Sequence, residues 1–123
     1  MQTFLPGTPY VMGSNDYPPI GKCLENDWAF SLATDFNPNC NSLSIPFAGS
    51  LAAHRCSIDP ISALAAVTRN PSTTLGYGGD VPVGSISVGM DADMNILKGS
   101  EVEMWCQMPG MNPISSTIIK GIL

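Results

Sequence analysis

The sequence predicts an α/β segment followed by a β-rich segment, on the basis of three observations. Two short apolar runs, QTFLPG at residues 2–7 and WAFSLA at residues 28–33, have the length of buried strands and are bounded by turn residues. Helical patterns lie between these runs and after the second one. Beyond residue 76 the chain is rich in glycine and in short alternating apolar segments, which is typical of strands joined by tight turns. We therefore expect a boundary near residues 76–80.

The first helix is predicted within IGKCLEN, between the two apolar runs. A polar, proline-bearing stretch, TPYVMGSNDYPP, precedes it. Ile20, Cys23 and Leu24 share one helical face in this segment. Asn26 and Asp27 can both adopt the left-handed conformation that ends a helix. The predicted order of elements is strand, helix, strand.

Two longer helices are expected after the strand at residues 28–33. In the first, Pro46 lies where the opening turn of a helix tolerates proline, and apolar residues recur at helical spacing through residues 47–52. In the second, Asp59 can accept hydrogen bonds from the free amides as N-cap, and Pro60 occupies the first helical position. The face expected for the second helix comprises Ile61, Leu64, Ala65 and Thr68. Gly76 is expected to end this helical region.

The β-rich segment is expected to contain strands within residues 77–99 and a final strand in STIIKGIL, residues 116–123. The α/β part, in contrast, offers only two strands. Parallel strands that are buried on both faces need neighbours at both edges, so two of them cannot close a sheet. We therefore expect this chain to be the tail of a longer protein.

Composition excludes several classes of partner and site. The net charge is −5, and the five Lys and Arg residues are scattered singly, so no basic stripe is present for nucleic acid. No apolar run reaches the length of a membrane span, which favours a cytoplasmic protein with no membrane partner. The four cysteines are widely spread without a CxxC pair, so reduced thiols are favoured over two disulfides. His54 is the single histidine and is expected in mid-helix, so a self-contained zinc site is not expected.

Several blocks in order along the chain carry a family resemblance. ATDFNPNC, SIPFAGSLA, DPISALAAVTRNPSTTLG, VGSISVGMDADMNIL and GMNPISSTIIKG resemble the carboxyl-terminal third of the metal-dependent amidohydrolases, and among them the imidazolonepropionase family. LPGTPY is similar to the seventh-strand segment of that family. The resemblance implies that residues 1–77 hold the last two strand-helix units of a (β/α)₈ TIM barrel. It also implies that residues 78–123 hold carboxyl-terminal strands of a small β-sandwich.

The resemblance departs from the family pattern at one position of the return from barrel to sandwich. The family has GS, an aliphatic residue, two variable positions, then GK, a variable position and AD; here the block is GSISVGMDAD, with Met90 at the lysine position. The resemblance implies structural roles for Gly84, Gly89 and Asp93.

Asp35 is the candidate catalytic and metal-binding residue. It stands directly after the apolar run WAFSLAT, and in barrels of parallel strands the catalytic groups project from the carboxyl ends of the strands. From the residues alone, Asp35 is either a turn or cap aspartate or a ligand. The resemblance implies that it follows strand eight and contacts the catalytic metal, zinc or iron, as a ligand or as a partner of its bound water.

The residues after Asp35 are candidates for substrate binding by the same resemblance. Asn37 matches a family asparagine that binds the substrate. Asn39 stands where glycine is common in the family, and Cys40 where threonine or serine is common. A backbone contact at Asn39 survives such a change, whereas a hydroxyl contact at Cys40 does not, because a thiol is a weak donor. The alternative is ordinary turn chemistry, in which asparagine side chains bond their own backbone.

The reaction implied by the resemblance is hydrolysis of a cyclic amide C–N bond, which converts 4-imidazolone-5-propanoate to N-formimidoyl-L-glutamate in histidine degradation. The remaining ligands would come from a missing amino-terminal barrel portion, and the isolated chain is expected to be inactive. Two alternatives stay open: a catalytically inactive fragment acting as a structural or interaction piece, and a freestanding β-rich binding module. Formation of a homo-oligomer is also left open.

Overall fold

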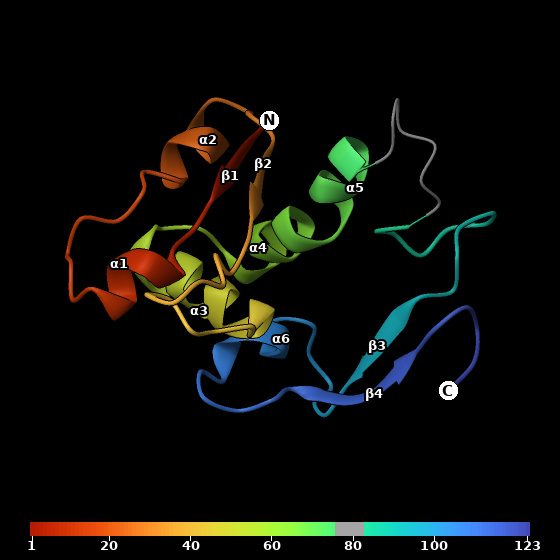
Figure 1. The fold of residues 1–123 in the computed structure, drawn as a ribbon. Coiled ribbons are helices and arrows are strands. Elements are labelled where there is room, and N and C mark those ends of the chain that lie inside the picture. The colour runs from red at the N-terminus through yellow and green to blue at the C-terminus, as the bar shows by residue number, and fades with distance from the viewer. Residues whose placement is uncertain (76–82) are drawn as a thin grey trace.

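The first two strands form a parallel pair. The computed structural model describes residues 1–75 and 83–123. In it, β1 (Gln2–Phe4) pairs with β2 (Phe30–Leu32), with Gln2 opposite Phe30. The crossover between them contains α1 (Gly7–Val11) and α2 (Gly21–Glu25) (Figure 1). The predicted order of strand, helix and strand is therefore confirmed, although the second strand is shorter than residues 28–33.

The helices of the crossover follow local signals only in part. Asp27 has a φ of 54°, so the left-handed residue expected after α2 is present, whereas Asn26 has a φ of −114°. The amide of Trp28 donates to the carbonyl of Cys23 at 2.8 Å and satisfies one carbonyl of the last turn. The short helix α1 lies in the stretch that the sequence marks only as polar and proline-bearing.

Three helices follow β2: α3 (Ile45–Arg55), α4 (Pro60–Val67) and α5 (Arg69–Leu75). Ser44 caps α3 by accepting from the amide of Phe47 at 3.2 Å. Asp59 caps α4 as predicted, since one carboxylate oxygen accepts from the amides of Ile61 and Ser62 at 3.0 and 2.9 Å. The end of the helical region expected at Gly76 lies outside the described residues, as does the predicted boundary at residues 77 and 78.

The buried face of α4 is not the predicted one. Ala63 and Ala66 are 0% exposed, whereas Ile61 is 46% exposed. The small side chains are those that let α4 approach β2 and α3 closely, and this packing outweighs the larger apolar area of isoleucine. Of the predicted face, Leu64 packs against the core, whereas Ile61 and Thr68 are exposed.

The second part of the chain contains β3 (Met94–Leu97), α6 (Met104–Gln107) and β4 (Ile114–Ile118). β3 and β4 pair antiparallel, with a register irregularity between Ile96 and Leu97. β3 lies within residues 77–99, where strands are expected, whereas the described residues 83–93 of that range consist of turns and irregular chain. Gly84 and Gly89 have φ of 94° and 90°, a conformation that glycine adopts most readily, and this explains why turns replace strands here.

The last predicted strand is displaced, and the turn that follows it uses Asp93. β4 begins at Ile114, and beyond Ile118 the chain forms only an isolated bridge between Ile119 and Ile122. The carboxylate of Asp93 accepts from the amide of Lys120 at 2.7 Å. Asp93 therefore holds this carboxyl-terminal turn against the start of β3.

One apolar cluster joins the two parts of the chain through α6. Trp105 donates its indole N–H to the carbonyl of Pro60 at 2.8 Å, and Ser50 donates its hydroxyl to the carbonyl of Cys106. The buried cluster comprises Ile20, Cys23, Phe30, Leu32, Ala52, Cys56, Ile58, Ala63, Ala66, Trp105 and Cys106. Figure 1 shows the β3–β4 pair beside α6, away from the parallel pair. The division into units at residue 77 stays a prediction, but α6 belongs to the core of the first part.

All four cysteines are free and buried in the structure. Burial raises the pKa of Cys106 to about 11 and also raises that of Cys56. Over residues 1–75 and 83–123, no helix is both long enough and apolar enough to cross a membrane. Both sheets of the described structure have two strands, so each strand has an unpaired edge.

Replacing Asp59 with alanine is expected to lower the free energy of unfolding by about 1 kcal/mol, because the first turn of α4 loses its N-cap. The pKa of Asp59 lies below its usual value of 3.8, chiefly because the Ser62 hydroxyl and amide donate to the carboxylate. The stabilisation that the Asp59 cap gives is thus fully present above pH 3.8 and is lost as the pH falls through the lowered pKa of Asp59. Urea unfolding of wild type and variant at pH 7 and in acid measures both effects, with Asp91→Ala, an exposed carboxylate, as control. If wild type and Asp59→Ala differed in unfolding free energy by the same amount at pH 7 and in acid, the cap could not depend on an ionised Asp59.

Candidate functional site

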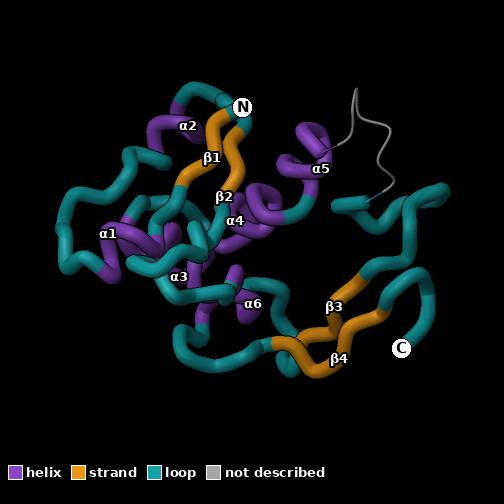
Figure 2. The backbone as a smooth tube through the Cα atoms, viewed as in Figure 1, coloured by secondary structure: helices purple, strands orange, loops and turns teal. Residues whose placement is uncertain are grey.

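Asp35 lies at the carboxyl end of the parallel pair, as predicted. It comes three residues after the end of β2 and lies beside α1, since it contacts Thr8 in the first turn of that helix. Figure 2 shows α1 following the end of β1, next to β2 in the parallel pair. The hydroxyl of Thr8 donates to Oδ2 of Asp35 at 2.6 Å. Asp35 is half-buried and has a φ of 54°, which is uncommon for a residue with a side chain. The carboxylate is therefore held at the edge of the sheet where barrel enzymes place their reactive groups.

The loop after Asp35 is built around Asn37. The side-chain amide of Asn37 donates to the backbone carbonyl of Asp35 at 2.6 Å. Its Oδ1 accepts from the amides of Asn39 and Cys40 at 2.8 and 3.2 Å. The backbones of Asn37 and Cys40 also exchange two hydrogen bonds. The turn chemistry considered as the alternative is present, and it occupies the side-chain oxygen of Asn37.

Cys40 is packed into the base of this loop. It is 0% exposed, and its thiol donates to the carbonyl of Thr34 at 3.4 Å. A Cβ atom on Gly7 would lie 2.9 Å from the Cys40 sulfur, so glycine permits this close approach of α1 to the loop. Asn39, in contrast, is exposed. The substrate contacts of Asn37, Asn39 and Cys40 stay predictions, and the described geometry gives Asn37 and Cys40 structural roles.

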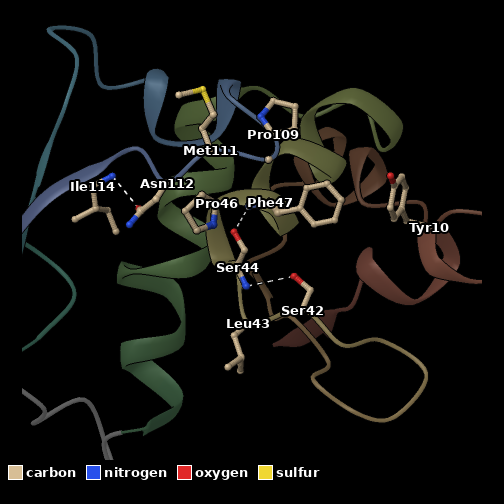
Figure 3. A pocket seen from close by; sticks show the side chains of 11 residues that line it. Tyr10, Ser42, Leu43, Ser44, Pro46, Phe47, Pro109, Met111, Asn112 and Ile114 are labelled. Carbon is tan, nitrogen blue, oxygen red and sulfur yellow. Dashed lines mark hydrogen bonds between the residues drawn. The ribbon is translucent and has the colours of Figure 1, made fainter.

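A hollow of about 790 Å³ lies near α1 and the start of α3 but is not lined by Asp35. Figure 3 shows the rings of Tyr10 and Phe47 on one side of it and Met111 and Pro109 on the other. The hydroxyls of Ser42 and Ser44 accept from the amides of Ser44 and Phe47, so they serve the local backbone. Among the described residues that line this hollow, none carries a charged or thiol side chain. Among the described lining residues, Tyr10 carries the one titratable side chain, and none is a His, Cys, Asp or Glu that could ligate a metal.

Comparison with known proteins decides the family. Residues 12–123 match the model of the amidohydrolase family. The chain belongs to the amidohydrolase family. It is 34% identical over 122 residues to the imidazolonepropionase of Parabacteroides distasonis, with 98% of this chain and 29% of the relative covered. It is 32% identical over 118 residues to that of Herpetosiphon aurantiacus, with 95% of this chain and 27% of the relative covered.

A third relative shows the same relation in length. The imidazolonepropionase of Symbiobacterium thermophilum is 34% identical over 123 residues, which cover 97% of this chain and 28% of the relative. The chain thus spans less than a third of the length of these curated relatives. The resemblance that the sequence blocks indicate is confirmed at the level of the family.

The metal-ligating side chains that the structure describes in this amidohydrolase chain do not gather at one place. Within residues 1–75 and 83–123, no three His, Cys, Asp or Glu side chains lie close enough together to hold an ion. His54 is exposed in the last turn of α3, not in mid-helix as expected. Among the described residues, only Thr8 donates to the Asp35 carboxylate, and it uses one oxygen. The donor set therefore fits one ligand of a shared site and does not fit a complete one.

Sequence reasoning missed Gly7 and Thr8. The sequence pattern marks Pro6 and Gly7 as a strand breaker and gives Thr8 no role. The signal was available: Thr8 is a hydroxyl residue just after one strand, and Asp35 is a carboxylate just after the next. The carboxyl ends of neighbouring parallel strands meet at the same edge, so the two side chains could have been paired from order alone.

Proposed function

We propose that this chain is the carboxyl-terminal part of a metal-dependent hydrolase of the imidazolonepropionase type. The proposed substrate is 4-imidazolone-5-propanoate, and the product is N-formimidoyl-L-glutamate, in histidine degradation in the cytoplasm. The single observation that carries the proposal is the position of Asp35, whose carboxylate is held by Thr8 at the carboxyl ends of two parallel strands. The similarity to imidazolonepropionases along 95–98% of this chain supports the choice of substrate.

Hydrolysis of this substrate adds a water oxygen to the ring carbonyl carbon. The bond from that carbon to the ring nitrogen then breaks, and the nitrogen keeps the electron pair and takes up a proton. A zinc or iron ion at such a site acidifies water and polarises the carbonyl. Asp35 would hold the ion, or accept a proton from the attacking water, through the carboxylate oxygen that Thr8 leaves free.

Asn39 has the best position of the three residues proposed for substrate binding. It is exposed at the tip of the loop, whereas the thiol of Cys40 is buried. We assign the substrate contact of this loop first to the backbone and side chain at Asn39. Asn37 would then act by holding the loop in shape through its three hydrogen bonds.

The proposed architecture is the end of a (β/α)₈ barrel followed by strands of a small β-sandwich. The parallel strands β1 and β2, each followed by helices, support the first part of this proposal. The antiparallel β3–β4 pair supports the second. The missing amino-terminal barrel portion would cover the open edges of both sheets and supply the remaining ligands.

The test is to combine this chain with a separately produced amino-terminal portion of one of these imidazolonepropionases, a mixture called here the assembled protein. We expect the chain alone, supplied with Zn²⁺, to show no turnover of imidazolonepropionate. The assembled protein is expected to restore turnover, because a tight site needs three or four donors held together. Loss of the ultraviolet absorbance of the ring follows the reaction.

Two controls make this comparison decisive. The amino-terminal portion alone must be inactive, and both preparations must be free of any full-length enzyme. Turnover by the 123-residue chain alone would overturn the shared-site proposal. An assembled protein that associates but neither binds Zn²⁺ nor turns over substrate would favour an inactive structural or interaction piece.

A further inference from the structure

We infer that Thr8 is a positioning residue for Asp35, which fixes the carboxylate for metal binding. The inference rests on the proposed function. It concerns a residue outside the set predicted from the sequence, and it is carried by a contact between two segments that lie 27 residues apart in the chain. The hydroxyl of Thr8 and Oδ2 of Asp35 are 2.6 Å apart, which is typical of a hydrogen bond to an ionised acceptor.

The backbone and rotamer of Thr8 suit it to this role. Thr8 lies in the first turn of α1, four residues after the end of β1, so the parallel pair sets its place. Threonine is branched at Cβ and has few χ1 rotamers, so its hydroxyl is held in direction more firmly than that of serine. Both Thr8 and Asp35 are half-buried, so water competes less for the bond than at an open surface.

The loop that carries Asp35 is held against the same segment by separate contacts. Gly7 lets the loop approach, since a Cβ there would lie 2.9 Å from the sulfur of Cys40 and 3.3 Å from the carbonyl of Thr34. Asn37 holds the backbone carbonyl of Asp35 at 2.6 Å. The backbone of Asp35 is thus fixed from one side and its carboxylate from the other.

This arrangement leaves one carboxylate oxygen for an ion. Carboxylates that bind metals are commonly hydrogen-bonded through their other oxygen, and loss of such a partner typically lowers metal affinity or activity about 10- to 100-fold. Thr8 occupies Oδ2, and among the described residues no donor is bonded to Oδ1. The hydrogen bond therefore stops the carboxylate from rotating away from the orientation in which Oδ1 can serve as a ligand.

The test compares Thr8→Val with Thr8→Ser in the assembled protein. Valine keeps the branched shape of threonine but removes the donor, whereas serine keeps the hydroxyl. We expect Thr8→Val to weaken binding of Zn²⁺ about 10- to 100-fold in equilibrium dialysis at fixed free Zn²⁺. We expect Thr8→Ser to stay much closer to wild type, and kcat to fall with the loss of zinc.

Thr3→Val is the matched control. The hydroxyl of Thr3 bonds that of Ser31 at 2.7 Å, so this variant removes a threonine hydrogen bond between β1 and β2 without touching Asp35. We expect it to change thermal unfolding more than zinc affinity. If Thr8→Val does not assemble, Thr8→Ala, a smaller side chain that also lacks the hydroxyl donor, takes its place in the comparison with Thr8→Ser.

Two results would overturn the inference while leaving the proposed function in place. One is wild-type zinc affinity in Thr8→Val, and the other is an equal loss in Thr8→Val and Thr3→Val, which would indicate a general effect on stability. Failure of the wild-type assembled protein to bind Zn²⁺ or to turn over substrate would refute the proposed function, and the inference with it.

Discussion

Replacing Asp35 with alanine in the assembled protein is expected to lower kcat/KM for imidazolonepropionate about 10²- to 10⁴-fold. The range is that for losing a positioned group that takes part in proton transfer. Asp35 is the residue of this chain placed at the carboxyl ends of the parallel strands with a carboxylate oxygen left free by its neighbours. Loss of ring absorbance measures turnover, and dialysis against Zn²⁺ measures metal content.

The control for this prediction is Asp16→Ala. Asp16 is an exposed carboxylate in the crossover between α1 and α2, and its side chain accepts no hydrogen bond from another described residue. We expect it to leave both turnover and zinc content close to wild type. An Asp35→Ala protein that keeps both properties would remove Asp35 from the site and reduce it to the turn aspartate that the residues alone also allow.

Replacing Gly49 with valine is expected to lower the free energy of unfolding by about 1–3 kcal/mol, the usual cost of overpacking a core. Gly49 lies in α3 where α6 crosses it. A Cβ there would lie 2.8 Å from an atom of the Trp105 ring and 2.9 Å from Cβ of Cys106. The ring cannot move aside freely, because its N–H is bonded to the carbonyl of Pro60. Urea unfolding followed by tryptophan fluorescence measures the change.

His54→Val on the same helix separates packing from helix propensity. His54 is exposed in the last turn of α3, so valine there adds a β-branched residue at a position open to solvent. We expect a change of only a few tenths of a kcal/mol. Equal losses at positions 49 and 54 would show that propensity, and not the approach of α6, governs the effect at Gly49.

The parts of the fold that follow from the sequence are those set by short-range chemistry. Asp59 before Pro60 predicts the start of α4, because a carboxylate accepts from free amides and proline tolerates the first helical position. The run of apolar residues around Phe30 predicts β2. Because Asp35 directly follows this run in the sequence, the prediction of β2 also places Asp35 at the carboxyl end of a strand. The family, too, follows from the order of sequence blocks, as the match to residues 12–123 confirms.

The errors occur where a long-range contact decides. The helix α6 has only four residues and no side-chain cap, so no short-range sequence signal predicts it. Its burial comes from Trp105 packing on α3. The buried face of α4 is set by which surface must approach β2 closely, and Ala63 and Ala66 are buried there whereas Ile61 is exposed. Residues 83–93 alternate like strands, yet they form turns, with Gly84 at a φ of 94° packed close to Thr68 and Ser72.

The sequence by itself determined the two strands, the cap of α4 and the place of Asp35 after its strand, because each depends on residues that are near one another in the chain. It also determined the family, through the order of its blocks along the chain. Only the tertiary structure decided that Thr8 holds Asp35, that Asn37 and Cys40 build the loop, and that α6 shares the core of α3. These contacts join residues up to 56 positions apart, as between Ser50 and Cys106. Which surfaces meet over such separations is settled by close packing and by the need to pair buried polar groups across the whole fold.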